Sequence, residues 1–491
     1  MILRIYKISR IFSFISFLII SIYASQFYEG SILIFGSYCF FLLLTIFYLT
    51  DSKATYFEIF FSCYFFLGFW FKYIFSLLFY NGHIFESGED KSVNIDEVLI
   101  LVIFISFVCL TSSFVNKNFF TKNVKKKEKR TESFFENFYL SNRNLILISF
   151  ILLIITVGFL NNKFGIHQRG FAYVTDNFFY INNFIKWLLL FGLTTFSCFI
   201  IHIEILNYKK INIFTIIVAF FEIFVSYTSM LSRSFVINGI SLILPIYQKF
   251  LFLKKICDKK FIFLFIILIF LTLISLYLTN YVRLSKSYAI ENEIKLEELR
   301  IKELNLEISK AEILPMNLHN QHVNPQPVIN FIIINRWIGI ESLIRVHNYK
   351  KKSFDLFFKA FGEDKNNLER TFYEKTFSIS KDNVSINQKY VKGNTLPGII
   401  SFLYYSGNIY FVLIFIFIIF FLFNFIERII RKITQENIIF CCFLSNMIAT
   451  RLFHFGYAPK DTYLFILSIL LSLLLMTFLI RFRFPHSLHN K

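Results

Sequence analysis

Residues 97–115, EVLILVIFISFVCLTSSFV, decide the fold class of this chain. After Glu97 the stretch has no charged side chain, and it nearly reaches the ~20 helical residues that cross a hydrocarbon core about 30 Å thick. An acidic segment precedes it and a basic segment follows it, as at a membrane helix with one defined orientation. The stretch therefore predicts a transmembrane helix.

The composition extends this prediction to the whole chain. Of its 491 residues, 56% are hydrophobic and only 17% are charged, whereas about a quarter of the residues in soluble domains are charged. Disordered chains lack so many large apolar residues, so intrinsic disorder is excluded. The net charge of +19 lies mostly between the hydrophobic runs. We therefore interpret it as a topology signal and expect no nucleic-acid partner.

Similar hydrophobic runs recur along the chain and predict an all-α polytopic membrane protein with about 12 transmembrane helices. The first run follows Arg4, Lys7 and Arg10 without a convincing cleavage site, so we interpret it as a retained helix and not a signal peptide. The runs are 11–28, 31–50, 56–80, 97–115, 144–160, 179–206, 211–229, 235–252, 261–280, 398–425, 437–455 and 462–480.

Basic residues in the short connections predict the orientation. The segment 116–143 has eight Lys and Arg residues against three acidic ones, whereas 81–97 has five acidic residues and one Lys. The other basic clusters fall on the side of 116–143, so this side is expected to be cytoplasmic, with both termini there. The protein would then lie in a bacterial inner membrane.

Residues 281–397 interrupt the series of short connections and divide the chain into three regions: helices 1–9 in residues 1–280, this loop, and helices 10–12 in residues 398–491. The loop is hydrophilic, lacks Cys and is expected on the periplasmic side between spans 9 and 10. Within it, 289–313 predicts a charged amphipathic helix, and 328–349 predicts a re-entrant or interfacial helix.

Arginines at the outer ends of the spans oppose the usual charge bias and are functional candidates. A guanidinium group offers forked donors that match phosphate oxygens, so such a cluster would suit a diphosphate-linked lipid. Alternatively, each one only extends to the interface or pairs with a carboxylate. The candidates are Arg169, Arg233, Arg283, Arg336, Arg345 and Arg451, with Arg345 expected near one helical face with Arg336.

Two further residues are candidates for proton transfer. Glu341 lies in an apolar segment, where desolvation would favour a usable base, although an ion pair with Arg336 or Arg345 is an open alternative. His454 follows Arg451 by three residues, which would put both on one helical face. His319 and His322 have no evident third ligand, and the Cys residues show no metal-ligand spacing, so no metal is expected. Nucleotide-binding and nucleophile-elbow motifs are absent, and no cofactor is expected.

Three segments resemble bacterial O-antigen polymerases, the oligosaccharide repeat-unit polymerases of the inner membrane. They are RWIGIE at 336–341, TLPGIISFLYYSG at 395–407 and RLFHFG at 451–456. The topology is similar over nearly the whole chain, whereas the motif similarity covers about 330–461, and the helix at 289–313 departs from the family pattern.

The resemblance implies a periplasmic glycosyltransferase acting on undecaprenyl-diphosphate-linked repeat units, within membrane lipid and with a chain-length regulator protein as a further partner. Arginines would stabilise the leaving phosphate, and a carboxylate or imidazole would deprotonate the acceptor hydroxyl. Pro397 and Gly398 are expected to start the tenth helix, whose N-terminus would favour an anion.

Two alternatives remain. An O-antigen ligase would have nearly the same topology and arginines. A lipid-linked oligosaccharide flippase or other transporter is disfavoured because the chain shows no matching halves and its charges are expected at the outer rim and not at the midplane.

Overall fold

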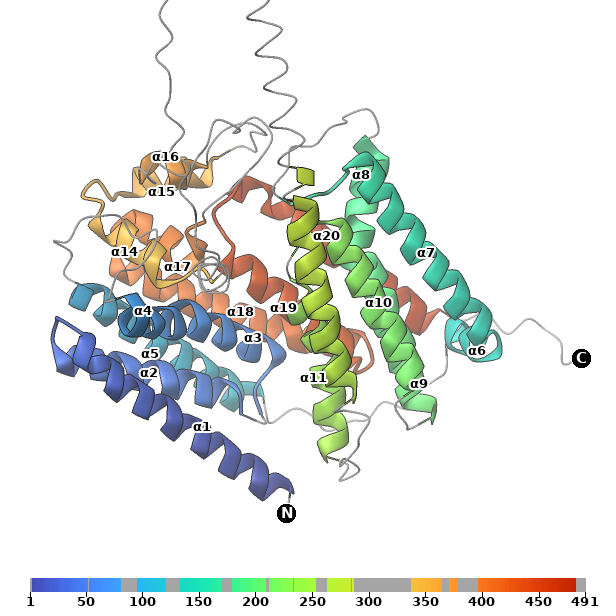
Figure 1. Ribbon diagram of the computed structural model, residues 1–491, viewed down its shortest axis with the longest axis horizontal. Helices are drawn as coiled ribbons and strands as arrows, with labels where there is room; N and C mark the ends of the chain where they lie inside the picture. The colour runs from blue at the N-terminus through green and yellow to red at the C-terminus, as the bar shows by residue number, and fades with distance from the viewer. Residues whose placement is uncertain are drawn as a thin grey trace, which may run out of the picture.

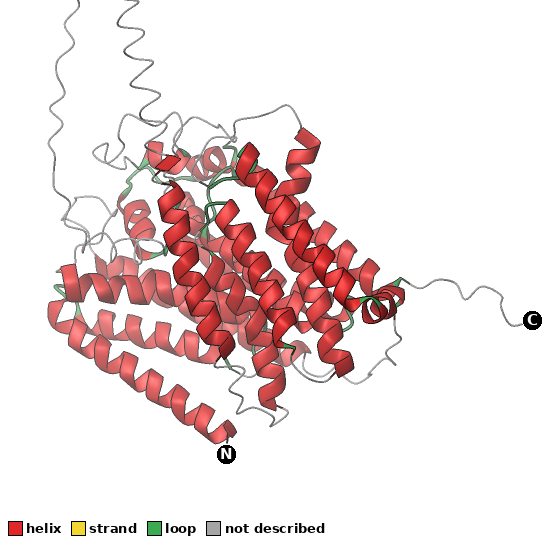
Figure 2. Ribbon diagram, turned by 45° about the vertical axis from the view of Figure 1, so that its right-hand side comes forward, coloured by secondary structure: helices red, strands yellow, loops and turns green. Residues whose placement is uncertain are grey.

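The computed structural model consists of packed α-helices, and no strand occurs in the residues that it describes (Figures 1 and 2). The described residues are 2–51, 53–80, 95–120, 133–169, 179–208, 212–232, 234–252, 263–283, 285–286, 337–363, 371–377 and 396–482. The predicted charged helix at 289–313 lies outside them.

The helices follow one another with short connections. The α-helices are α1 (Ile2–Ala24), α2 (Ile32–Leu49), α3 (Tyr56–Phe65), α4 (Lys72–Tyr80), α5 (Ile95–Phe120), α6 (Phe134–Ser141), α7 (Arg143–Phe164), α8 (Phe179–Trp187), α9 (Leu193–Tyr208), α10 (Ile213–Ser229), α11 (Phe235–Phe252), α14 (Ile340–Asn348), α15 (Phe354–Phe361), α16 (Phe372–Thr376), α17 (Gly398–Leu403), α18 (Ile409–Ile433), α19 (Ile438–Phe453) and α20 (Thr462–Arg481). A further helix covers Phe263–Arg283. Single turns of other helical types are η1 (Ser25–Phe27), η2 (Phe66–Phe71), η4 (Leu188–Gly192), η6 (Tyr404–Ser406) and η7 (Pro459–Asp461).

Long apolar helices confirm a polytopic membrane architecture. Among the described residues, nine helices are long and apolar enough to cross a membrane. Three of the predicted runs coincide instead with shorter apolar helices, at Ile213–Ser229, Phe235–Gln248 and Ile438–Phe453.

The predicted tenth span, 398–425, was wrong at its start. Gly398 begins the short helix α17, and the chain then turns at Gly407, which has a left-handed φ of 69°. The long apolar helix begins only at Ile409 of α18, where the Asn408 side chain accepts a hydrogen bond from the Phe411 amide. The reason is local: the left-handed backbone at Gly407 and the Asn408 cap end one helix and start another. The expected anion site at the N-terminus of the tenth helix is therefore not at Gly398.

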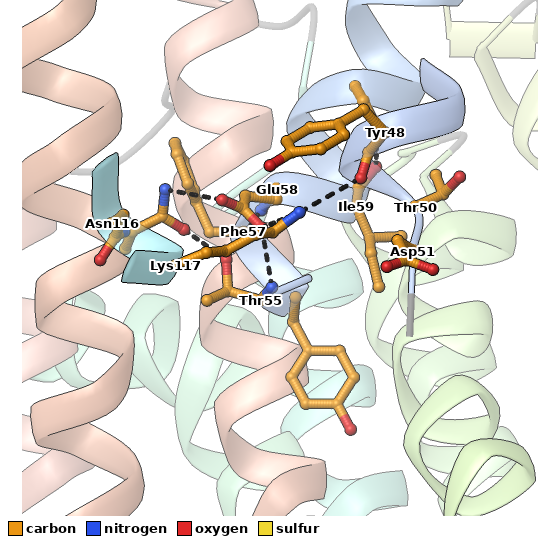
Figure 3. A network of polar contacts seen from close by, with 12 residues as sticks. Tyr48, Thr50, Asp51, Thr55, Phe57, Glu58, Ile59, Asn116 and Lys117 are labelled. Carbon is orange, nitrogen blue, oxygen red and sulfur yellow. Dashed lines mark hydrogen bonds and ion pairs between the residues drawn. The ribbon is translucent and has the colours of Figure 1, made fainter. Parts of the chain in front are cut away.

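Contacts sort the helix ends into two sets. At one end, Arg10 forms an ion pair with Asp51, and the Arg428 guanidinium donates to the backbone of Asn116. Figure 3 shows the polar network there, in which Lys117 approaches Glu58 to 4.0 Å and donates to the carbonyl of Tyr48 at 3.3 Å. These segments are the ones that the charge pattern assigns to a single side.

The opposite end carries the elements of the candidate site. Helices α14 to α17 gather at this end of the bundle, near α4 and α18 (Figure 1). Helix α19 lies centrally and packs against α3, α9, α11, α17 and α18. Two neighbouring glycines determine how α14 is seated against the bundle.

Candidate functional site

Helix α14 is held in the bundle by a close approach of two backbones. A Cβ atom on Gly339 would lie 2.1 Å from the carbonyl oxygen of Gly68, and one on Gly68 would lie 2.3 Å from that of Ile338. Gly68 lies in η2, a π-helical turn within the third predicted span. Because only glycine permits this approach, the segment preceding α14 lies directly on that span. Ile340–Val346 are all buried.

Glu341 forms a buried ion pair with Lys72, the first residue of α4. The Lys72 Nζ atom lies 2.9 Å from Glu341 Oε1, and both side chains are at most 6% exposed. Lys72 also donates to the carbonyl of Trp337, and the Gly339 amide donates to Glu341 Oε1. Glu341 Oε2 has no hydrogen-bond partner. The expected ion pair of Glu341 therefore exists, but its partner is Lys72 and not Arg345.

Arg345 lies one turn further along α14. Its side chain is buried, and its Nε and Nη1 atoms have no hydrogen-bond partner. A buried guanidinium with unpaired donors is unfavourable by a few kcal/mol in such surroundings. The arrangement is therefore suited to an anion that brings oxygen acceptors.

His347, at the end of α14, belongs to a second polar group that sequence reasoning considered only as a metal ligand. Its Nε2 lies 3.1 Å from Glu97 Oε2, and its Nδ1 lies 3.3 Å from the hydroxyl of Tyr404. Burial, followed by the nearby Lys352 ammonium, lowers the pKa of His347, although Glu97 opposes this change. The imidazole is therefore neutral near pH 7. Since a carboxylate only accepts, Nε2 donates to Glu97, and Nδ1 is left as the basic nitrogen.

The three segments that carry the family resemblance meet in the structure. The Ser342 hydroxyl of α14 donates to the Pro397 carbonyl at 2.8 Å and lies 2.9 Å from the Ser401 hydroxyl of α17. The Gly398 amide donates to the Phe455 carbonyl at 3.1 Å. Together with Phe69 and Phe453, these segments line a small cavity. Residues more than a hundred positions apart thus form one packed unit.

The structure groups three of the predicted arginines at the same end. Arg283 donates to the carbonyls of Leu231 and Arg169, so its guanidinium binds backbone oxygens in place of solvent. Arg169 is exposed, and Arg451 lies within electrostatic range of both Arg169 and Asp461. The Nε atom of Arg451 is buried and has no hydrogen-bond partner.

Several sequence predictions lie outside the described residues, namely Arg233, Arg336, His319 and His322. The expectation that Arg336 and Arg345 share a helical face is wrong, because α14 starts at Ile340 and the described residues before it, from Trp337, are not helical. The cause is the extended backbone at Gly339, which lies against Gly68.

His454 is also not on a helical face with Arg451. Helix α19 ends at Phe453, and His454 is its C-cap residue. Its Nδ1 lies 2.9 Å from the Thr450 carbonyl, which can only accept, so Nδ1 carries the proton of the neutral ring.

Sequence reasoning missed the charged residues inside the spans. Lys72, Glu204, Glu222 and Glu427 are all buried in the bundle, which corrects the expectation that charges lie only at the outer rim. Each interrupts an apolar run, and an ionisable residue within a membrane span is by default a functional candidate. This signal was available in the sequence at Lys72, in the run FLGFWFKYIF at 66–75.

The described residues contain no group of three or more His, Cys, Asp or Glu side chains that could hold a metal ion. Comparison of the chain with protein-family models, curated proteins and solved structures finds no match.

Proposed function

We propose that this protein is a membrane glycosyltransferase that polymerises undecaprenyl-diphosphate-linked oligosaccharide repeat units. The observation that carries the proposal is the meeting of the three family-like segments around α14, where Arg345 is buried with unpaired donors. Forked, permanently charged donors suit the diphosphate of a lipid-linked sugar.

The reaction places defined demands on such a site. The acceptor hydroxyl of one lipid-linked unit attacks the anomeric carbon of the growing chain, and the bond from that carbon to the diphosphate breaks. Negative charge then develops on the leaving undecaprenyl diphosphate. A fixed guanidinium such as that of Arg345 stabilises this charge more in a buried site than in water.

The acceptor hydroxyl must also lose its proton. Glu341 has a free Oε2 atom, but its other oxygen is committed to Lys72, so its first role is to hold α14 against α4. His347 combines a neutral imidazole, partial exposure and a carboxylate that orients the ring. We therefore favour His347 as the base and retain Glu341 and His454 as candidates for the same test.

Orientation is part of the proposal. The end that carries Arg10, Lys117 and Arg428 would face the cytoplasm of a bacterial inner membrane, because short basic connections remain inside. The α14 end would then face the periplasm, where lipid-linked repeat units are exposed and where a chain-length regulator would bind.

Deletion of the gene, scored by gel ladders of surface glycan, tests the function. Loss of a polymerase leaves glycans with a single repeat on the lipid A core, and plasmid-borne wild type restores the ladder. Loss of a ligase leaves long polymer on the lipid carrier, and loss of a flippase removes surface glycan altogether. Either of the last two results contradicts the proposal.

The transporter alternative is strengthened by one structural observation, the four carboxylates buried within the bundle, Glu58, Glu204, Glu222 and Glu427. Three of them have partners that explain their burial. Glu204 contacts Arg143, Glu58 lies near Lys117, and Glu427 accepts from the amides of Tyr56 and Phe57. Only Glu222 lacks such an explanation.

A further inference from the structure

Glu222 lies in the middle of α10, where it faces α9, and its side chain is inaccessible to solvent. Within the described residues no Lys or Arg forms an ion pair with it. A lone carboxylate in an apolar interior is unfavourable unless a positive charge or a proton compensates it. Its surroundings show which of the two is suited to the site.

Oxygen atoms surround the carboxylate. Glu222 Oε1 lies 3.2 Å from Thr194 Oγ1 and 3.2 Å from Ser226 Oγ. Ser197 also faces the carboxylate, but its buried hydroxyl forms no hydrogen bond of normal geometry. The second carboxylate oxygen, Oε2, is likewise buried and without a hydrogen bond. The site thus contains five oxygens, two of which have no partner.

The distances differ from those at the other buried carboxylates. Hydroxyl groups approach Glu204 to 2.6 Å from Thr215 and to 2.7 Å from Tyr139, and Ser445 approaches Glu427 to 2.8 Å. These are close to the ~2.5–2.7 Å expected when a hydroxyl donates to a carboxylate. The oxygens around Glu222 are therefore spaced too widely for strong charge-assisted hydrogen bonds.

We propose that Glu222, Thr194, Ser197 and Ser226 form a binding site for one sodium ion between α9 and α10. Calcium, which is similar in size to sodium, lies ~2.3–2.6 Å from its oxygen ligands, so neighbouring ligands around it are roughly 3.3–3.7 Å apart. The 3.2 Å separations at Glu222 are close to this spacing. A potassium ion would require a wider shell.

Charge and backbone geometry agree with a monovalent ion. One sodium ion neutralises the single carboxylate, whereas a divalent ion would leave an uncompensated charge in an apolar interior. The ligands are all hard oxygens, which such cations prefer. Thr194 also follows the π-helical turn η4 at Leu188–Gly192, and π-helical turns occur frequently at functional sites.

Thermal unfolding of the purified full chain in detergent tests the site independently of any glycan assay. The melting temperature is measured across a NaCl series balanced to constant ionic strength with choline chloride, and again with KCl. We expect it to rise with sodium as for one-site binding and to remain constant with potassium. A melting temperature that does not depend on sodium would overturn the proposal and indicate that the carboxyl holds a proton.

Two variants locate the effect. Glu222→Gln should abolish the sodium response, while Glu436→Gln, which removes an exposed carboxylate paired with Arg431, should preserve it. Ser197→Ala breaks no hydrogen bond of normal geometry and should raise the half-saturating sodium concentration by about tenfold or more, as loss of one supporting group does at metal sites. If Glu222→Gln does not fold, Ser197→Ala decides, and an unchanged half-saturating concentration overturns the proposal.

Discussion

Lys72 and Glu341 are the residues whose charges are most deeply involved in the site. Two oppositely charged groups that are almost fully buried lose much of their hydration, and only their short contact compensates this loss. Removing one of them leaves the other as an uncompensated charge in the bundle.

Lys72→Met should therefore destabilise the protein by about 3–5 kcal/mol, and the double variant Lys72→Met/Glu341→Gln should recover much of this loss. Unfolding in detergent, followed by fluorescence, measures both. Glu341→Gln alone separates the two roles of the residue, because loss of a base reduces the specific activity by ~10²–10⁴ at a normal protein level. A normal ladder at a normal protein level would exclude Glu341 from catalysis.

Arg345→Lys retains a positive charge but loses the forked donors, so polymer formation should fall by roughly 10² if the guanidinium binds the leaving phosphate. Arg431→Lys is the matched control, because Arg431 pairs with Glu436 on an exposed surface at the opposite end of the bundle. In vitro polymerisation with purified protein measures both variants. Equal activity of the two would show that Arg345 has no role in phosphate recognition.

His347 gives the reaction a pH dependence if it is the base. Burial and Lys352 lower the pKa of His347, so the imidazole remains neutral down to a pH below its ordinary value of ~6.5. Activity should fall only as the pH drops through that lowered value. Lys352→Met removes the nearby cation, raises the pKa of His347 and should move this acidic limb to higher pH.

The control for this test is Lys359→Met, since Lys359 is exposed and paired with Asp355. Its pH–rate profile should be that of the wild type. A Lys352→Met profile that also coincides with the wild type would remove His347 from consideration.

At the scale of elements, the decisive contact is that between the segment before α14 and η2. It has no side chains between the two backbones, because Gly339 and Gly68 face each other. Any side chain there must separate the two elements, and with them Lys72 from Glu341.

Gly339→Ala should therefore destabilise the protein by about 1–3 kcal/mol or more, as overpacking does, and should reduce activity. Gly36→Ala is the matched control, because a Cβ at Gly36 of α2 has open space around it and alanine favours a helix. Melting temperatures of the two variants test the contact. A Gly339→Ala protein as stable as Gly36→Ala would show that α14 is not seated on η2.

For the whole molecule, the essential question is which end faces the cytoplasm. A reporter that is active in the cytoplasm should function when fused after Lys129, and one that is active in the periplasm should function near Asn366. Alkaline phosphatase and green fluorescent protein fusions measure this. Reporters on the same side of the membrane would contradict the proposed function, because the α14 end would then not face exported substrate.

The sequence alone determined the membrane class, the helical architecture and most of the span positions. It could do so because crossing a hydrocarbon layer requires a long apolar run, and this requirement is local in the chain. Charge asymmetry across each span is local in the same way. The helix boundary near Gly407 was missed because its left-handed turn lies within a stretch that remains apolar on both sides.

The tertiary structure decided the composition of the site. Glu341 was predicted as a candidate, but its partner, Lys72, is in a helix far away in the sequence, and His347 became a candidate base only through Glu97 and Tyr404. The same holds for Glu222, whose character depends on three hydroxyl groups, two of them on a neighbouring helix. The physical reason is that the behaviour of a buried charge depends on which groups surround it, and these come from segments that only folding brings together.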